Sequence, residues 1–326
     1  MINKTELSSK IIKEFTDKDG VCKYSKKKLG EILHERHPDL FKDGESARTF
    51  IRVTTRSKGR HITTPELSVT WNGFKLPEPE KNDFTKVIVN QKRIGILSDI
   101  HFPYHDRKAL DSAVHHLIEF NPDCIVLNGD TLDCYHLSSF DKNPKNRSFK
   151  HELDVLRNFC IQLRELFPTK RIIFKLGNHE ERYERTILNR VPQLIELELF
   201  SFKEVIKARN FSIEVVDNKR IIKAGHLNIA HGHEFSKGFV APVNPARGYY
   251  MKAKSNVIAG HNHRTSEHME KDINEKTIGA WSTGCLCELN PGYMPINSWN
   301  HGFATVENNG TDFKVNNIKI IKGKVL

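Results

Sequence analysis

The sequence predicts a layered α/β domain with its sheet inside, preceded by a small helical domain. From about Lys92 onward, short apolar strands alternate with amphipathic helices, which is the order typical of layered α/β domains. Residues 1–60 show helical periodicity instead, and residues 61–92 are polar and interrupted by prolines. We therefore expect a helical domain at 1–60, a linker at 61–92 and a larger domain at 93–326.

Three short helices are expected in residues 1–60. The first covers residues 5–16, where apolar side chains recur on one face. The second begins after Ser25, a good N-cap, and ends before Pro38. The third runs over residues 46–57 and carries arginines at helical spacing on its outer face: Arg48, Arg52 and Arg56. This arrangement fits a helix-turn-helix module, although many small helical bundles share it.

The charge distribution suggests an anionic partner. The chain has a net charge of +11, and residues 1–60 hold fifteen Lys and Arg against nine Asp and Glu. Basic patches attract nucleic-acid phosphates because binding releases condensed counterions. A nucleic acid or nucleotide is the expected partner, and plain solubility is the alternative explanation.

Cysteine usage and hydropathy indicate a reduced, cytoplasmic protein without a membrane segment. No apolar run approaches the roughly 20 residues of a membrane helix, and the N-terminus lacks the apolar core of a signal peptide. The six cysteines include no CxxC pair. Cys285 and Cys287 form a CxC, which we interpret as strand residues rather than as part of a zinc site.

The larger domain is expected to begin with strands and helices in alternation. Its strands are expected at 93–98, 124–127, 171–176, 227–230 and 257–259, and its helices at 109–120, 151–167 and 180–190. Residues 276–326 alternate in polarity and contain turn signals, so this part is expected to be mostly β.

Five of the expected strands are each followed directly by a polar cluster. In chain order the clusters are Asp99-Ile-His101, Gly129-Asp130-Thr-Leu-Asp133, Gly177-Asn178-His179-Glu180, His231-Gly-His233 and Gly260-His261-Asn-His263. Ligands bind at the carboxyl ends of strands in α/β sheets, so these side chains are expected to share one rim. Carboxylate, imidazole and amide oxygen together suit paired divalent ions, above all Mn²⁺, with Fe or Zn²⁺ as alternatives.

The order DxH, GDxxD, GNHE, HGH and GHxH resembles the calcineurin-like metallophosphoesterase superfamily over about residues 93–285. The resemblance implies a layered β-sandwich flanked by helices and a site for two divalent metal ions. It assigns the first metal to Asp99, His101, Asp130 and His263. It assigns the second metal to Asp130, Asn178, His231 and His261.

The resemblance also implies catalytic roles for two further residues. His179 would contact the phosphate and aid the leaving group, and Asp133 would orient His179. A hydroxide made by the metals would attack phosphorus in line with the leaving oxygen. Candidate substrate-binding residues are His233, which either contacts the phosphate or merely lines the rim, and Arg182 and Arg247.

Three functions are compatible with the sequence. The preferred one is a phosphodiesterase or nuclease acting on nucleic acid or nucleotides, because the N-terminal segment is basic. The second is a phosphomonoesterase of proteins or small molecules. Protein phosphatases of this family carry GDxxDRG, whereas Cys134-Tyr135 follow Asp133 here, and this departure disfavours a protein substrate. The third is a non-catalytic nucleic-acid-binding scaffold, against which the complete ligand set argues.

Overall fold

The computed structural model describes residues 3–58, 81, 83–138, 148–235 and 243–326. The chain forms two compact units, which meet in the sequence between Glu80 and Lys81. No helix in the described ranges combines the length and the apolar character that crossing a membrane requires. Each unit is considered by itself.

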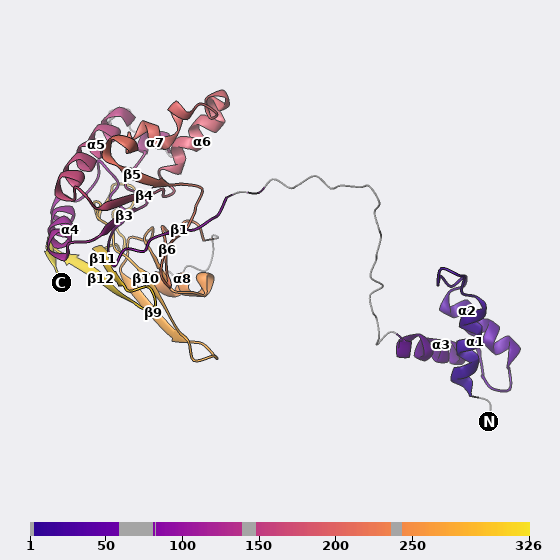
Figure 1. Cartoon of the computed structure of the whole chain (residues 1–326). Coiled ribbons are helices and arrows are strands. Elements are labelled where there is room, and N and C mark those ends of the chain that lie inside the picture. The colour runs from indigo at the N-terminus through magenta and orange to yellow at the C-terminus, as the bar shows by residue number, and fades with distance from the viewer. Residues whose placement is uncertain (1–2, 59–80, 82, 139–147, 236–242) are drawn as a thin grey trace. The chain divides into compact units, whose positions relative to one another are not determined.

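The N-terminal unit contains three helices, α1 (Lys4–Glu14), α2 (Lys26–Arg36) and α3 (Gly44–Lys58) (Figure 1). Side chains cap the first two helices, because Asn3 accepts from Thr5 N and Ser25 accepts from Lys28 N. The apolar faces of the helices meet in one core, made by Ile11, Leu29, Leu33, Phe41, Ala47 and Ile51. The three expected helices are therefore present.

The basic outer face of α3 is less available to an anionic partner than the sequence suggests. Arg48 lies 3.0 Å and Arg52 lies 3.9 Å from the Glu45 carboxylate. The side chain of Arg56 lies outside the described residues. Glu45 therefore offsets part of the positive charge on this face.

The larger unit is built on two β-sheets. One has seven strands in the order β13-β12-β11-β2-β3-β4-β5, and the other has six in the order β1-β6-β7-β8-β10-β9. The strands are β1 (Val87–Ile88), β2 (Arg93–Leu97), β3 (Cys124–Asn128), β4 (Arg171–Lys175), β5 (Ile213–Val216), β6 (Ile222–Ala224), β7 (Leu227–Ala230), β8 (Val257–Ala259), β9 (Ser266–Lys271), β10 (Thr277–Ser282), β11 (His301–Asn308), β12 (Phe313–Ile321) and β13 (Lys324–Val325). The helices are α4 (Arg107–Phe120), α5 (Phe149–Leu166), α6 (Glu181–Arg190), α7 (Phe202–Val205) and α8 (Pro245–Ala253).

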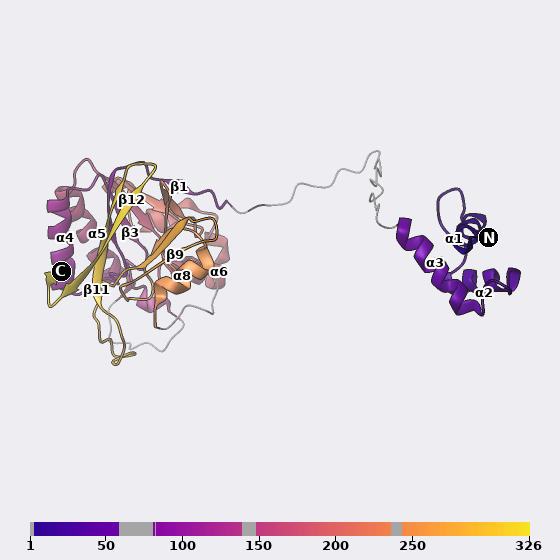
Figure 2. The same ribbon diagram turned by 90° about the horizontal axis from the view of Figure 1, so that it is seen from below.

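The two sheets pack face to face, with helices outside them (Figures 1 and 2). Ile94 and Ile96 of β2 enter the core between the sheets together with Ile229 of β7. Leu97 belongs to the second core, under α4 and α5, because alternate side chains of a strand point to opposite faces. A third apolar cluster, around Tyr249, joins α8 to β8 and β10. This architecture confirms the predicted β-sandwich flanked by helices.

The larger unit starts earlier than the expected boundary at Lys92. Strand β1 pairs in parallel with β6, with Val87 opposite Ile222, and Val89 is fully buried. A two-residue strand carries no periodic signal, and prolines and charged residues precede it in the sequence. Its stability comes from the neighbouring strand, which sequence pattern alone does not display.

The topology places the polar clusters at one edge. Strands β2, β3 and β4 are adjacent and parallel, so the residues that follow them lie together. Strands β7 and β8 are parallel neighbours in the other sheet. The loops after all five strands therefore meet where the carboxyl ends of the two sheets come together.

Candidate metal centre

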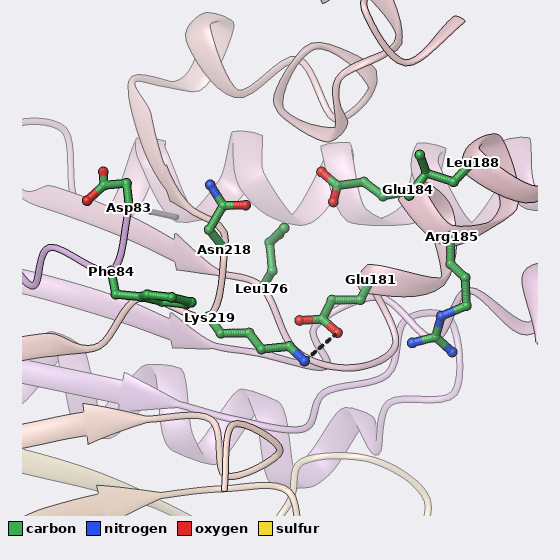
Figure 3. A pocket seen from close by; sticks show the side chains of 9 residues that line it. All are labelled: Asp83, Phe84, Leu176, Glu181, Glu184, Arg185, Leu188, Asn218 and Lys219. Carbon is green, nitrogen blue, oxygen red and sulfur yellow. Dashed lines mark ion pairs between the residues drawn. The ribbon is translucent and has the colours of Figure 1, made fainter. Parts of the chain in front are cut away.

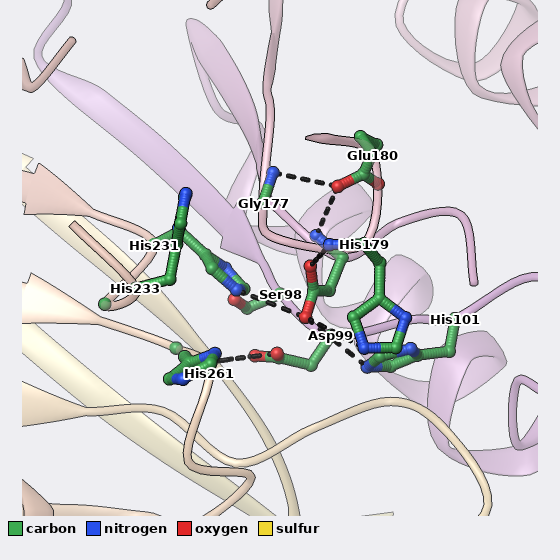
Figure 4. A network of polar contacts seen from close by, with 12 residues as sticks. Ser98, Asp99, His101, Gly177, His179, Glu180, His231, His233 and His261 are labelled. Carbon is green, nitrogen blue, oxygen red and sulfur yellow. Dashed lines mark hydrogen bonds and ion pairs between the residues drawn. The ribbon is translucent and has the colours of Figure 1, made fainter. Parts of the chain in front are cut away.

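One group of expected ligands converges around Asp99. The His263 Nε2 atom lies 3.2 Å from Asp99 Oδ1 and 3.2 Å from His101 Nε2. His101 Nε2 lies 3.9 Å from Asp130 Oδ2. All four side chains are buried (Figure 4 shows two of them, Asp99 and His101). They form the set that the resemblance assigns to the first metal.

Asp130 links this group to a second one. Its Oδ1 atom accepts the backbone N–H of His179 at 2.9 Å, so the other oxygen, Oδ2, faces the imidazoles. Oδ2 lies 3.3 Å from His231 Nε2, and the ligand atoms of Asp130, His231 and His261 all lie within 4.8 Å of one another. A carboxylate in this position can bridge two cations.

The chemistry of these donors fits divalent cations. The Asn178 Oδ1 atom is buried and has no hydrogen-bond partner among the described residues. Such an orphaned oxygen is costly unless an ion or water satisfies it. His231 Nδ1 lies 2.8 Å from the Asn128 carbonyl, which leaves Nε2 as the metal-facing atom. Carboxylate oxygens and imidazole nitrogens thus lie close together, and divalent cations would offset the negative charge of Asp99 and Asp130.

Five of the seven expected ligands have left-handed backbone conformations. Their φ angles lie between 49° and 67°, at Asp99, His101, Asp130, His261 and His263. Asp and His tolerate this region better than most residues, yet each such residue stores about 1–3 kcal/mol of strain. Strain of this kind gathers at functional sites, because the surrounding sheets hold the backbone in place.

His179 lies beside the ligand groups in a dense set of polar contacts. Its Nδ1 atom is 2.8 Å from the Asp133 carbonyl and 3.2 Å from Asp133 Oδ1. The Asp133 carboxylate is shared, because Oδ1 is also 2.9 Å from His101 Nδ1. Arg182 donates to the Asp133 carbonyl at 3.0 Å and to His179 Nε2 at 2.9 Å. His101, Asp130 and His179 also form a three-residue group of metal-binding geometry, so a ligand role for His179 is the alternative to proton donation.

The comparisons with known proteins agree with this geometry. The family model described as calcineurin-like phosphoesterase matches residues 92–277. The chain belongs to the calcineurin-like phosphoesterase family. It is accordingly a metal-dependent phosphoester hydrolase, and its family uses a dinuclear metal site.

Two curated relatives of this phosphoesterase come from bacteriophages. The "Gene 54 protein" of Mycobacterium phage L5 is 25% identical over 245 residues, which are 72% of this chain and 95% of the phage protein. The protein of the same name from Mycobacterium phage D29 is 23% identical over the same shares.

Three of the solved structures to which the chain is similar at low identity are the following. Vacuolar Protein Sorting 29 from Cryptosporidium parvum is 11% identical, with a TM-score of 0.41, and covers 73% of this chain and 96% of its own. YfcE, a phosphoesterase from E. coli, is 12% identical, with a TM-score of 0.35, and covers 72% and 96%. A dimetal phosphatase from Danio rerio is 12% identical, with a TM-score of 0.36, and covers 68% and 98%.

In this phosphoesterase, buried charged residues that were not predicted to act at the site hold the loops that carry the expected ligands. The Glu180 carboxylate accepts backbone N–H groups of Asp130 at 3.0 Å, Leu132 at 2.8 Å and Gly177 at 2.8 Å (Figure 4 draws the Gly177 bond). Burial and the nearby Asp130 charge raise the pKa of Glu180 to about 7. Glu180 therefore ties the loops after β3 and β4 together.

A buried ion pair holds the loop after β7. Lys175 lies 2.7 Å from the Glu234 carboxylate, which accepts the backbone N–H groups of His231 at 3.0 Å and Gly232 at 2.6 Å. Both charged side chains are almost fully buried. Breaking such a pair leaves an uncompensated buried charge, so the pair fixes His231 through its backbone.

The expected substrate-binding residues are not gathered at one place. Arg182 lies at the centre through its contacts with His179. His233 borders the second ligand group, with its ring centroid 5.3 Å from that of His231 and 6.5 Å from that of His261, and its Nε2 lies 2.8 Å from Glu181 Oε1. Arg247 is an exposed residue of α8, and no described contact joins it to the centre.

A cavity of about 400 Å³ adjoins the centre through Glu181 (Figure 3). Its lining mixes apolar and charged side chains: Asp83, Phe84, Leu176, Glu181, Glu184, Arg185, Leu188, Asn218 and Lys219. None of the seven expected metal ligands lines it. Glu181 pairs with Lys219 on the cavity side and with His233 on the side of the centre.

Proposed function

We propose that the chain is a phosphodiesterase or nuclease acting on nucleic acid or nucleotides, with Mn²⁺ as its preferred metal. The observation that supports hydrolysis most directly is the position of Asp130 Oδ2, which lies within 3.9 Å of His101, His179 and His231. The nucleic-acid substrate rests on the basic N-terminal unit.

The donor sets that would hold the ions are those that the family resemblance implies, and the contacts of Asp130 support them. Asp99, His101, Asp130 and His263 would bind one cation. Asp130, Asn178, His231 and His261 would bind the other. When bound, two divalent cations supply a hydroxide at neutral pH and neutralise charge on the phosphoryl oxygens.

His179 would hold the proton that the leaving oxygen needs. Burial lowers the pKa of His179, but the charges of Asp130 and Asp133 outweigh burial and raise the pKa above its ordinary value. The two carboxylates thus favour the charged imidazole, whereas the positive charge of Arg182 opposes it. Asp133 orients the ring through Nδ1 and leaves Nε2 as the atom that donates.

Arg182 would make the protonation of His179 depend on substrate binding. An arginine only donates hydrogen bonds, so its contact with His179 Nε2 requires that nitrogen to be unprotonated. A substrate phosphate offers the guanidinium a better acceptor. Once Arg182 turns to the phosphate, Nε2 can take up the proton that it later donates.

The N-terminal unit would supply affinity for the nucleic-acid backbone. Lys26, Lys27 and Lys28 form the exposed first turn of α2, and of these Lys28 lies 3.2 Å from Glu31 Oε2 in the next turn. Positive charge at a helix N-terminus opposes the helix dipole, so this turn attracts anions at a cost to helix stability. The helix-turn-helix interpretation of the unit belongs to this proposal.

The test combines metal analysis with a substrate panel for the full-length chain. We expect about two divalent ions per chain and Mn²⁺-dependent cleavage of DNA and simple phosphodiesters. Turnover of monoesters alone would make the protein a phosphomonoesterase. Bound metal with no hydrolysis of any ester, together with DNA binding, would favour the scaffold alternative.

A further inference from the structure

A loop of residues 283–300, between β10 and β11, is attached to the metal centre near both of its ends. Leu286 N donates to the Asp99 carbonyl at 3.0 Å, and Asn300 N donates to the His263 carbonyl at 3.0 Å. Asn300 also accepts the Thr265 N–H through its side chain, at 2.8 Å. The loop is therefore held in place relative to two expected ligands, Asp99 and His263.

Hydrogen bonds inside the loop fix its shape. The Asn297 side chain donates to the carbonyls of Leu289 at 2.6 Å and Met294 at 2.9 Å, and accepts the Trp299 N–H at 2.8 Å. Asn290 donates to the Pro295 carbonyl at 3.0 Å. Backbone held in this way presents its side chains with little loss of entropy when a ligand binds.

This loop displays two aromatic rings next to the centre. The Trp299 ring lies 4.2 Å from the His263 ring, at an interplanar angle of 63°. The Tyr293 ring lies 6.4 Å from the Trp299 ring, and Tyr293 is 74% exposed. Partial burial and the charge of Asp133 raise the pKa of Tyr293.

The position of the rings relative to the phosphate site identifies what they would bind. Tyr293 is exposed and Trp299 is half-buried, so a flat ligand that covered them would remove apolar surface from water. Any group stacked on Trp299 would lie next to His263, hence next to a phosphate held at the centre. Nucleobases are flat rings attached close to a phosphate, and they stack on aromatic side chains without regard to base identity.

We propose that Trp299 forms a stacking platform for a nucleobase adjacent to the scissile phosphate, with Tyr293, inclined at 63° to it, contacting the edge of the base. The platform would make the enzyme prefer esters that carry a nucleobase over esters that do not. This inference rests on the proposed function, since it names the chemical group by which that site recognises its substrate.

The test compares matched substrates with and without a base. The diester pair is thymidylyl-thymidine and glycerophosphoethanolamine, and the monoester pair is thymidine 5′-monophosphate and glycerol 3-phosphate. We expect Trp299→Ala to lower kcat/KM for the base-containing member roughly 5- to 150-fold, the range that corresponds to one stacked base. We expect Trp299→Phe, which keeps a ring, to restore most of the loss, and Tyr293→Ala to act in the same direction.

Ile296→Ala is the matched control, because Ile296 belongs to the same loop and is 92% exposed. It should leave the substrate preference unchanged. An equal fall on both members of a pair in Trp299→Ala would assign Trp299 a structural role and overturn the platform. A Trp299→Ala variant that keeps the wild-type preference for the base-containing member would also overturn the platform. If only monoesters turn over, the diesterase proposal fails, but the monoester pair still decides whether the base matters.

Fluorescence gives a readout that does not depend on catalysis. Stacking of a base should quench Trp299 when a short oligothymidylate binds, whereas an abasic oligomer should not produce this quenching. Trp281 is buried on β10 and should not respond. Equal quenching in wild type and Trp299→Phe would contradict the platform.

Discussion

The Nε2 atom of His231 lies 3.3 Å from Asp130 Oδ2, while Nδ1 of the same ring lies 2.8 Å from the Asn128 carbonyl. A proton on Nδ1 satisfies the carbonyl. The contact with Asp130 then needs either a second proton or a cation. Burial lowers the pKa of His231, but Asp130 outweighs it and raises the pKa to about 10 without metal. Asp99 raises the pKa of His263 to about 10 in the same way.

Metal binding should therefore release protons. The raised pKa values favour protonated His231 and His263 at pH 7 in the metal-free protein, so cations would have to displace these protons. We expect release of about two protons for full loading, and metal affinity that rises with pH from 6.5 to 9. Calorimetry in two buffers of different ionisation enthalpy measures the number of protons that metal binding releases. Release of no protons would contradict the assignment of these histidines.

The metal-free protein should also become less stable as pH rises. The folded-state pKa values near 10 exceed the ordinary value of 6.5, so the stabilisation is complete below pH 6.5 and is lost toward pH 10. The metal-loaded protein should not show this decline, because its imidazoles are already unprotonated. Urea unfolding of EDTA-treated and Mn²⁺-loaded protein at pH 6.5, 8 and 9.5 tests the difference.

Replacement of His179 should separate proton donation from metal binding. We expect His179→Asn to lower kcat roughly 10²- to 10⁴-fold, the usual contribution of a general acid, with unchanged metal content. Substrates with a good leaving group should be affected less, because they need less protonation. Loss of one metal ion in this variant would instead make His179 a ligand, which its distance of 3.8 Å from Asp130 Oδ2 permits.

Gly177 should tolerate no side chain. A Cβ atom at this position would collide with Oδ1 and the backbone nitrogen of Asp130. We expect Gly177→Ala to displace Asp130, to destabilise the protein by about 1–3 kcal/mol and to weaken metal binding. Gly44→Ala is the control, since its nearest neighbours would lie 3.5 Å away, an ordinary contact. Metal analysis and thermal unfolding of both variants distinguish a local clash from a general effect of alanine.

The positive charge of the first turn of α2 should affect the affinity for DNA but not the rate of phosphodiester hydrolysis. Changing Lys26, Lys27 and Lys28 together to Gln should weaken DNA binding. The slope of log affinity against log salt should become shallower by up to about 2.7, because up to three phosphate contacts are lost. Hydrolysis of a small diester should remain at the wild-type rate. An unchanged salt slope would show that these lysines do not face the nucleic acid.

The strands and ligand loops that the sequence predicts are those with strong local signals. Strands β2 and β3 are continuous apolar runs, and polar clusters mark where they end. Strands β5 and β6 and helix α7 have three or four residues each and were not predicted. Strands β7 and β8 are equally short, but the clusters His231-Gly-His233 and Gly260-His261-Asn-His263 mark their ends, whereas no expected ligand follows β5, β6 or α7 directly.

The polar residues that shape the centre were harder to predict than the ligands. Glu180 acts through N–H groups as far as 50 residues away in the sequence, and Lys175 acts through Glu234. Cys287, whose Sγ atom lies 3.8 Å from His263 Nδ1, belongs to the CxC that we interpreted as strand residues. These roles depend on distances that only the fold creates, and a linear pattern does not encode them.

The left-handed backbone conformation of the expected ligands serves the function of the protein but lowers its stability. At His261, with φ of 67°, glycine would relieve strain that histidine has to bear. Selection of variants for thermal stability alone would therefore favour replacement of the ligands. The selected proteins would be more stable, but they would no longer hydrolyse phosphate esters. Engineering of this enzyme has to screen for turnover and thermal tolerance together.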